Sequence, residues 1–165
     1  MESRPKLKIQ LSATDKIIET AGWLILLSQW VFTVWSYSKM PDIILVHSNG
    51  AGEPNDYGSK STIILLPVIA TVIFCAMTLI IRYPHIFNYP VKLTEENIVK
   101  QYTIATRLIR VLKTSLVIIF SFTVLLTWCT ANNKNAGLGI WFLPLTTLFI
   151  FLPLGYFISK MIKMK

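Results

Sequence analysis

Charged residues are scarce in this chain. Only 15% of its 165 residues are Asp, Glu, Lys or Arg, whereas about 25% is usual for a soluble domain. Hydrophobic residues make up 53% of the sequence. A soluble protein of this size has too much surface to hide so many apolar side chains from water. The composition therefore favours a protein whose outer surface is covered by lipid.

The sequence also lacks the motifs that carry common chemistry. It has no Gly-rich phosphate loop, no Ser-His-Asp order and no His-x-x-x-His metal pair. The two cysteines, Cys75 and Cys129, form no metal or redox pattern and are expected to be unpaired packing residues. The sequence thus assigns no catalytic residue, no metal ligand and no cofactor, and it favours a protein that is not an enzyme.

Four long stretches have no charged residue in their middle. They lie at about residues 17–38, 61–82, 113–132 and 138–159. Each has close to the roughly 20 residues with which a helix crosses a hydrocarbon core about 30 Å thick. Because ionisable groups inside a membrane mark ion or proton pathways, their absence argues against a pump or a coupled transporter. The predicted fold is all-α: residues 1–165 form one membrane domain, a four-helix transmembrane bundle.

The positions of lysine and arginine predict the orientation. Only Lys39, Lys60 and Lys134 fall on one side of the predicted spans, and all the others fall on the opposite side. The side rich in Lys and Arg faces the cytoplasm in most membrane proteins, so both termini are predicted to be cytoplasmic. Basic flanks beside anionic lipid explain the net charge of +8 without nucleic acid as a partner.

Small and hydroxyl residues form stripes along three of the predicted spans. The stripes are Gly22, Gln29, Thr33 and Ser36; Pro67, Thr71, Cys75 and Thr78; and Thr123, Thr127 and Thr130. In lipid such residues mark helix contacts, because backbones approach closely and hydroxyls pair there. We therefore expect these faces to point inward, although chance scatter of Ser and Thr remains an alternative for any one stripe.

The predicted outer loop, residues 40–60, is rich in turn signals. A short apolar piece precedes Asn49-Gly50, which is a strong turn signal, and Gly52, Pro54 and Gly58 add further turns. The pattern indicates a folded loop rather than a slack linker.

The same loop contains one histidine among several acids. His47 with Asp42, Glu53 and Asp56 offers the donors of a metal or ligand site. The alternative is that His47 and Asp56 hydrogen-bond the backbone of their own loop. We favour this alternative, because the spacing matches no metal signature.

The predicted cytoplasmic loop leads into an amphipathic segment. Pro84 and Pro90 fix a bent link, and Thr94 is a candidate N-cap, followed by Glu95 and Glu96 in the first turn. Apolar residues then share one helical face: Ile98, Tyr102, Ala105, Ile109 and Leu112. We expect an interfacial helix that lies along the cytoplasmic membrane surface before it turns into the third span. It is either a docking surface for a protein partner or, as we favour, a connector at the lipid surface.

Two groups of residues carry a resemblance to a known family. The outer group is Pro41, Asp42, His47, Asn49, Gly52, Glu53, Pro54, Tyr57, Gly58 and Lys60, and the cytoplasmic group is Pro84, His85, Asn88, Pro90, Glu95 and Glu96. Over about residues 20–113 the chain resembles a bacterial membrane-domain family of unknown function. That domain also forms the N-terminal part of SdpI-type immunity proteins.

The resemblance implies a role in the bacterial cytoplasmic membrane, as a protein that senses or protects against an envelope-acting agent. It implies a peptide ligand at the outer loop or a protein partner at the cytoplasmic loop. Two alternatives remain open. One is a structural or accessory subunit of a membrane complex, and the other is a membrane enzyme with a site at Asp42, His47 and Asp56.

Overall fold

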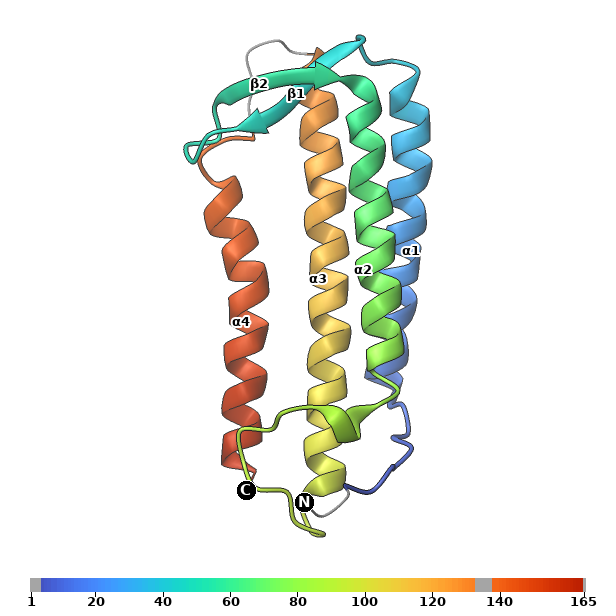
Figure 1. Ribbon diagram of the computed structural model, residues 1–165, viewed down its shortest axis with the longest axis vertical. Helices are drawn as coiled ribbons and strands as arrows, with labels where there is room; N and C mark the ends of the chain where they lie inside the picture. The colour runs from blue at the N-terminus through green and yellow to red at the C-terminus, as the bar shows by residue number, and fades with distance from the viewer. Residues whose placement is uncertain (1–3, 133–137, 165) are drawn as a thin grey trace.

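Four long helices dominate the computed structural model, which describes residues 4–132 and 138–164. They are α1 (Ala13–Tyr37), α2 (Leu65–Ile80), α3 (Ile98–Asn132) and α4 (Phe142–Lys163), with short 3-10 turns η1 (Lys60–Ile64) before α2 and η2 (Pro84–Ile86) after it. All four helices, α2 together with η1, are long and apolar enough to cross a membrane. They lie side by side with both termini at the same end (Figure 1). The prediction of a helical, multi-pass membrane protein is confirmed.

A β-hairpin lies across the end of the molecule opposite the termini (Figure 1). Its strands, β1 (Ile43–Ser48) and β2 (Pro54–Ser59), are antiparallel and join α1 to η1. The folded loop predicted from its turn residues is therefore confirmed. Ile44 of β1 is buried against Ile63 and Val124, so the apolar face of the hairpin is held on the helices. We call this the hairpin end, and the opposite one the terminal end.

Helices α1, α2 and α3 form a closely packed bundle. Its middle is a cluster of Leu26, Ala70, Phe74 and Val117. The predicted inward stripe of α1 is confirmed, because Gly22, Gln29, Thr33 and Ser36 are all buried. The stripes of α2 and α3 are buried only at Pro67 and Thr130, and their other members are half-buried. A side-chain carbon added to Gly22 would lie 2.8 Å from the Phe74 ring, so glycine permits this close approach.

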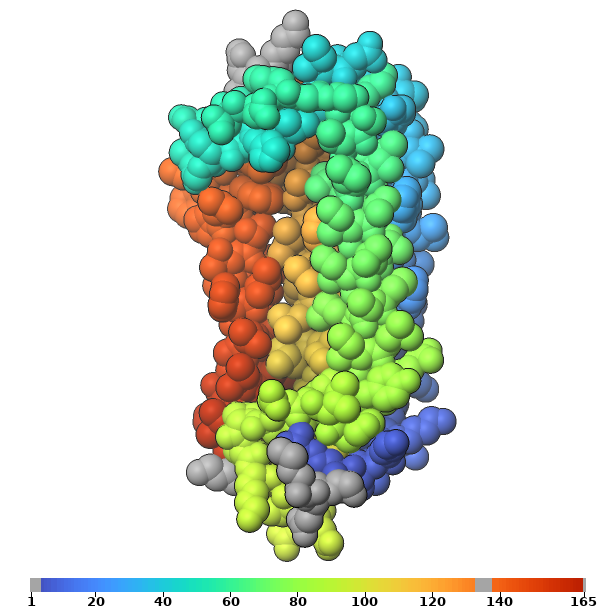
Figure 2. Space-filling view, in the orientation of Figure 1, coloured from blue at the N-terminus to red at the C-terminus, as the bar shows by residue number. Residues whose placement is uncertain are grey.

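Helix α4 is attached differently. It packs against α3 near the terminal end, where Phe157 and Met161 join a cluster with Ile104, Ala105 and Leu108. The Gln101 side-chain amide donates hydrogen bonds to the carbonyls of Met161 and Met164, each at 2.9 Å, and so caps the end of α4. Towards the hairpin end α4 stands away from the other helices, and the separation persists with side chains drawn (Figure 2). The four predicted helices thus form a three-helix bundle with a fourth helix fixed mainly at one end.

One predicted feature needs correction. The amphipathic segment at 98–112 does not lie along the membrane surface and turn into the third span. It is the first part of α3, which runs without a break for 35 residues. The segment contains no Gly or Pro that would break a helix. Part of its apolar face, including Ala105, is covered by α4, so lipid does not have to cover it.

Candidate functional site

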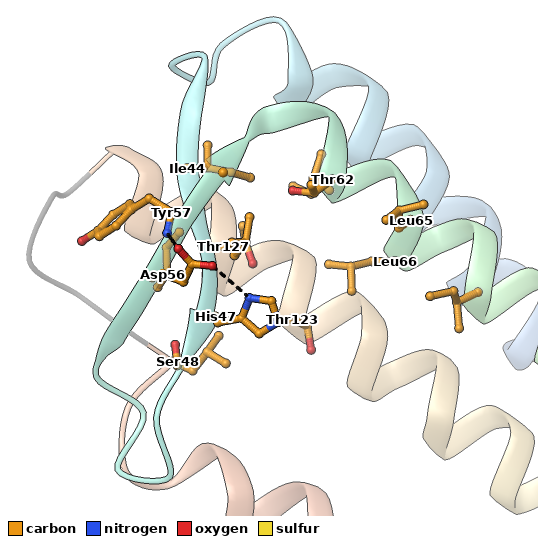
Figure 3. Close-up of a pocket in the computed structure, with 16 residues that line it drawn as sticks. Ile44, His47, Ser48, Asp56, Tyr57, Thr62, Leu65, Leu66, Thr123 and Thr127 are labelled. Atoms are coloured by element: carbon orange, nitrogen blue, oxygen red, sulfur yellow. Dashed lines mark hydrogen bonds and ion pairs between the residues drawn. The ribbon is translucent and has the colours of Figure 1, made fainter.

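The hairpin covers a recess of about 460 Å³ between itself and the helices. Leu65, Leu66 and Ile69 of α2 form one wall, and Thr123 and Thr127 of α3 lie opposite the strands (Figure 3). The hairpin contributes β1 from Ile44 to Ser48 and part of β2. The lining is therefore mainly apolar, with two hydroxyl groups on α3. A recess of this composition suits the apolar part of a small ligand.

His47 and Asp56 face each other across the two strands at the recess. Their side chains are 73% and 67% exposed, and His47 Nδ1 lies 3.8 Å from Asp56 Oδ2. That distance is too long for a hydrogen bond. The other carboxylate oxygen of Asp56 accepts a hydrogen bond from the Tyr57 backbone at 2.9 Å, while the Tyr57 ring points away from the recess (Figure 3). The two side chains therefore keep polar atoms available to a bound molecule.

The other two acids near His47 have partners of their own. Lys60 Nζ lies 2.9 Å from Asp42 Oδ1 at the base of the hairpin, and the Lys60 backbone donates to the Asp42 carbonyl. Glu53 accepts a hydrogen bond from the Asn49 side chain at 2.9 Å. The four residues that the sequence offered as one site are therefore divided among three places. Among the residues that the structure describes, no group of three or more His, Cys, Asp or Glu side chains is placed to hold a metal ion.

The hairpin tip is built around Asn49. Its side-chain oxygen accepts hydrogen bonds from the backbones of Ala51 and Glu53, each at 3.0 Å, which folds the turn. Gly52 has φ of +79°, a conformation that favours glycine. A side-chain carbon there would lie 2.4 Å from the carbonyl oxygen of Gly139. The backbone N–H of Gly139 donates a hydrogen bond to the Gly52 carbonyl at 3.3 Å. The tip is thus joined to the segment that begins α4.

The remaining outer-group residues shape the strands. Pro41, Pro54 and Tyr57 are exposed. Gly58 pairs with Ile44, and a side-chain carbon on it would lie 3.1 Å from Val46, so a small residue suits this crossing. The structure therefore gives most of the outer group a role in building the hairpin. Among its His, Asp, Glu and Lys residues, only His47 lines the recess, where Asp56 faces it.

The loop at the terminal end is folded on the rest of the protein. Pro84 is buried, and its carbonyl accepts a hydrogen bond from the Tyr89 hydroxyl at 2.8 Å. The Tyr89 ring stacks on Tyr102 of α3 with 5.5 Å between ring centres, and Arg4 donates to the Phe87 carbonyl. Burial, together with the neighbouring Tyr102, raises the pKa of the Tyr89 hydroxyl well above its usual value. The loop is tied to both the N-terminal segment and α3.

Some residues in and around the cytoplasmic group stabilise the fold, and others are exposed on the surface. Thr94 and Asn97 hydrogen-bond each other reciprocally, so Thr94 caps the approach to α3 as predicted. His85 is half-buried. Four residues of the group are exposed: Asn88, Pro90, Glu95 and Glu96.

Sequence reasoning missed a group of charges between α1 and α3, which we call the ionic cluster: Asp15, Glu19, Arg107, Arg110 and Lys113. Arg107 bonds both carboxylate oxygens of Asp15, at 2.7 and 3.0 Å. Lys113 is fully buried, and its ammonium donates to Glu19 at 2.5 Å and to Thr78 of α2 at 2.6 Å.

The spacing of the ionic-cluster residues forms a recognisable pattern in the sequence. Asp15 and Glu19 are four residues apart, and Arg107, Arg110 and Lys113 are three apart, so each set lies on one helical face. Nothing local showed that the two faces meet. The cluster lies at the terminal end, where Ser12 caps α1 through Asp15. It therefore joins α1, α2 and α3 far from the hairpin.

Part of the chain is similar to known proteins. Residues 24–71, which contain most of α1, the hairpin and the start of α2, match a family described as a domain of unknown function, DUF1648. An uncharacterized protein of Archaeoglobus fulgidus is 27% identical in an alignment of 88 positions, and the match covers 48% of this chain and 48% of that protein. The chain thus spans about half the length of this relative. No solved structure matches.

Proposed function

We propose that this protein binds the apolar part of an envelope-acting peptide in the recess beneath the hairpin, and senses or protects against that peptide. The observation that carries the proposal is the combination of an apolar wall on α2 with two exposed polar groups, His47 and Asp56, at the same recess. An amphiphilic peptide has both kinds of surface. The resemblance to SdpI-type immunity proteins supports this choice among possible amphiphiles.

The position of the recess supports a ligand that arrives from the membrane surface. With both termini in the cytoplasm, as the basic residues indicate, the hairpin lies at the outer surface. Trp35 and Trp128 lie near this end, with their ring centres 5.7 Å apart. Tryptophan is enriched where a membrane protein meets the membrane–water boundary. A peptide that partitions into the outer leaflet would therefore meet the recess at its own depth.

The hairpin also offers a way to report binding. Its tip is joined to the segment before α4 through Gly52 and Gly139. A ligand under the strands that displaces the tip would thus act on α4, which packs against α3 mainly near the other end. Such a displacement would connect outer binding with the cytoplasmic end of α4.

A substitution that fills the recess tests the proposal. Ile69 lines the recess and is 44% exposed, so Trp fits there with little disturbance of the core. We expect cells that produce the protein to survive a membrane-active peptide from a challenge panel. Ile69→Trp should lower the highest peptide concentration that these cells survive at least about fourfold. It should also weaken binding of the same labelled peptide to the protein in nanodiscs, because a filled recess no longer offers apolar contacts to the peptide.

Val68→Trp is the matched control, because Val68 is the neighbouring residue, is 40% exposed and does not line the recess. It should protect as the native chain does. The proposal fails if the native chain neither protects against nor binds any peptide of the panel. It also fails if Ile69→Trp and Val68→Trp behave alike.

A further inference from the structure

The recess beneath the hairpin carries charge of one sign. Of the described residues that line it, Asp56 alone has a charged side chain when histidine is counted as neutral at pH 7. The carboxylate of Asp42 pairs with Lys60 at the hairpin base, outside the recess. Glu53 bonds Asn49 at the tip, also outside it. The recess therefore offers one carboxylate, with no opposite charge in its described lining, beside an apolar wall.

A ligand can reach this carboxylate. The Asp56 side chain is 67% exposed, and its Oδ2 faces His47 Nδ1 at 3.8 Å (Figure 3). One ammonium nitrogen fits between these two atoms, about 2.9 Å from each, because an ammonium has three N–H donors and a neutral imidazole accepts on one nitrogen. A carbonyl or an ionised phosphate has no donor for the carboxylate. The pair therefore suits a cationic N–H group.

The apolar wall fixes how such a ligand would lie. Leu65, Leu66 and Ile69 continue the lining along α2. From Leu65 to Ile69 the wall extends about 6 Å at 1.5 Å per residue. With the hairpin at the outer surface, the wall lies on the bilayer side of Asp56. Lysine and arginine side chains adopt this arrangement at membrane surfaces, with the charged group in the polar layer and the apolar part below it.

Lipid is the competing occupant, because the recess lies at membrane depth. An acyl chain suits the apolar wall as well as a peptide does. The phosphate of an anionic lipid would face the Asp56 carboxylate, and like charges repel each other. A lipid ammonium is accompanied by its own phosphate, so the headgroup is neutral overall. Charge therefore distinguishes a cationic peptide from the surrounding lipid.

We propose that the recess selects peptides that carry a cationic N–H group beside an apolar segment, with Asp56 and His47 binding that group. This inference rests on the proposed function and names the class of peptide. The charge of the hairpin region agrees with it. Residues 40–60 contain three acids and one base, a net charge of −2, whereas the whole chain has +8. Such a local field raises the concentration of cationic ligands near the site.

Two matched peptides test the selection on the full chain in phosphatidylcholine nanodiscs, with empty nanodiscs as background. Each peptide has a run of leucines beside one variable residue, lysine in the first and glutamine in the second, with blocked ends and a fluorescent label. We expect the native chain to bind the lysine peptide about fivefold more tightly, the upper range for an exposed ion pair. Asp56→Asn keeps an acceptor for the Tyr57 backbone but removes the charge, so this preference should disappear.

Glu53→Gln is the matched control, because it removes one negative charge from the same hairpin outside the recess. It should keep the preference for lysine. Equal binding of the two peptides by the native chain, or binding of neither, overturns the inference. A preference that survives Asp56→Asn, or that Glu53→Gln also abolishes, overturns it too.

Two further arms separate the explanations. If phosphatidylethanolamine in the nanodiscs abolishes the preference for lysine, the lipid ammonium occupies the site and the inference fails. If both peptides bind equally and Ile69→Trp weakens both, binding in the recess stands and only the charge selection fails.

Charge reversal gives an independent result that a misfolded protein cannot produce. Asp56→Lys should bind a third peptide, with glutamate at the variable position, more tightly than the lysine peptide. A variant that still prefers the lysine peptide overturns the role of Asp56.

Discussion

The two ends of the molecule are held together by different kinds of contact. At the terminal end, buried charges of α1 and α3 satisfy one another, and Lys113 also reaches α2. At the hairpin end, a two-stranded sheet lies across the helices, and its polar pair of His47 and Asp56 is exposed. Buried ion pairs tolerate little displacement, because each charge depends on its partner. Exposed polar groups do not depend on each other in this way.

This difference suggests a division of roles. The terminal end fixes how the helices are packed, and it holds α4 through the cluster with Phe157. The hairpin end encloses the recess and is joined to the beginning of α4 by a backbone contact at Gly52. A protein that binds at one end needs the other end to stay in place, so substitutions at the two ends should have separable effects.

The largest effect is expected at Asp15. This carboxylate is buried, accepts hydrogen bonds from Arg107 and from Ser12, and lies 4.0 Å from Arg110. Asp15→Ala leaves Arg107 without its carboxylate partner, takes from Arg110 one of its two acidic neighbours and breaks the capping box with Ser12. We expect a loss of about 3–5 kcal/mol in the free energy of unfolding. Titration with SDS, followed by circular dichroism, measures it.

Lys16→Ala is the control for Asp15, because Lys16 is the next residue and is exposed. It should change stability by less than about 0.5 kcal/mol. If both variants unfold at the same SDS concentration as the native chain, the ionic cluster does not hold the terminal end.

A smaller and more local effect is expected at Gly52. Gly52→Ala places a side-chain carbon against the Gly139 carbonyl in a backbone conformation that alanine rarely adopts. The strain in the backbone at position 52 should amount to about 1–3 kcal/mol, and movement of the hairpin tip should relieve it. We expect the distance between spin labels at Asn55 and Leu145 to increase while the α1–α3 contacts stay unchanged.

Gly50→Ala provides the matched control, since nothing lies within 4 Å of a side-chain carbon at Gly50. It should leave the label distance as in the native chain. A distance that is unchanged in Gly52→Ala would show that the tip does not fix the start of α4.

The smallest effect on stability is expected at His47. Because its pair with Asp56 is exposed and too long for a hydrogen bond, His47→Ala should change the free energy of unfolding by less than about 0.5 kcal/mol. Peptide binding should nevertheless weaken roughly 2- to 12-fold, the range for one lost hydrogen bond. Asn55→Ala, also exposed on β2 but outside the recess, should change neither quantity. A large loss of stability in His47→Ala would contradict the separation between the two ends.

Much of the fold was predictable because it depends on local patterns. Long apolar stretches predicted the four helices, and Asn49-Gly50 predicted the turn of the hairpin. The stripe through Gly22 and Thr33 predicted the buried face of α1, since small residues are needed where helices approach. Of the candidate site, the sequence named His47 and Asp56 but also grouped Asp42 and Glu53 with them. It could not show that these two acids have other partners, or that α2 and α3 complete the recess.

By itself, the sequence determined which stretches prefer lipid, where the chain turns and which side of each helix is small or polar. These properties follow from residue types a few positions apart. The tertiary structure alone decided that α3 runs unbroken past the ionic cluster, that Arg107 meets Asp15 and that α4 packs mainly on α3. Those outcomes depend on which helix faces are paired across long separations in the chain, and several pairings satisfy the same hydrophobic pattern. Packing and buried charge select one of them.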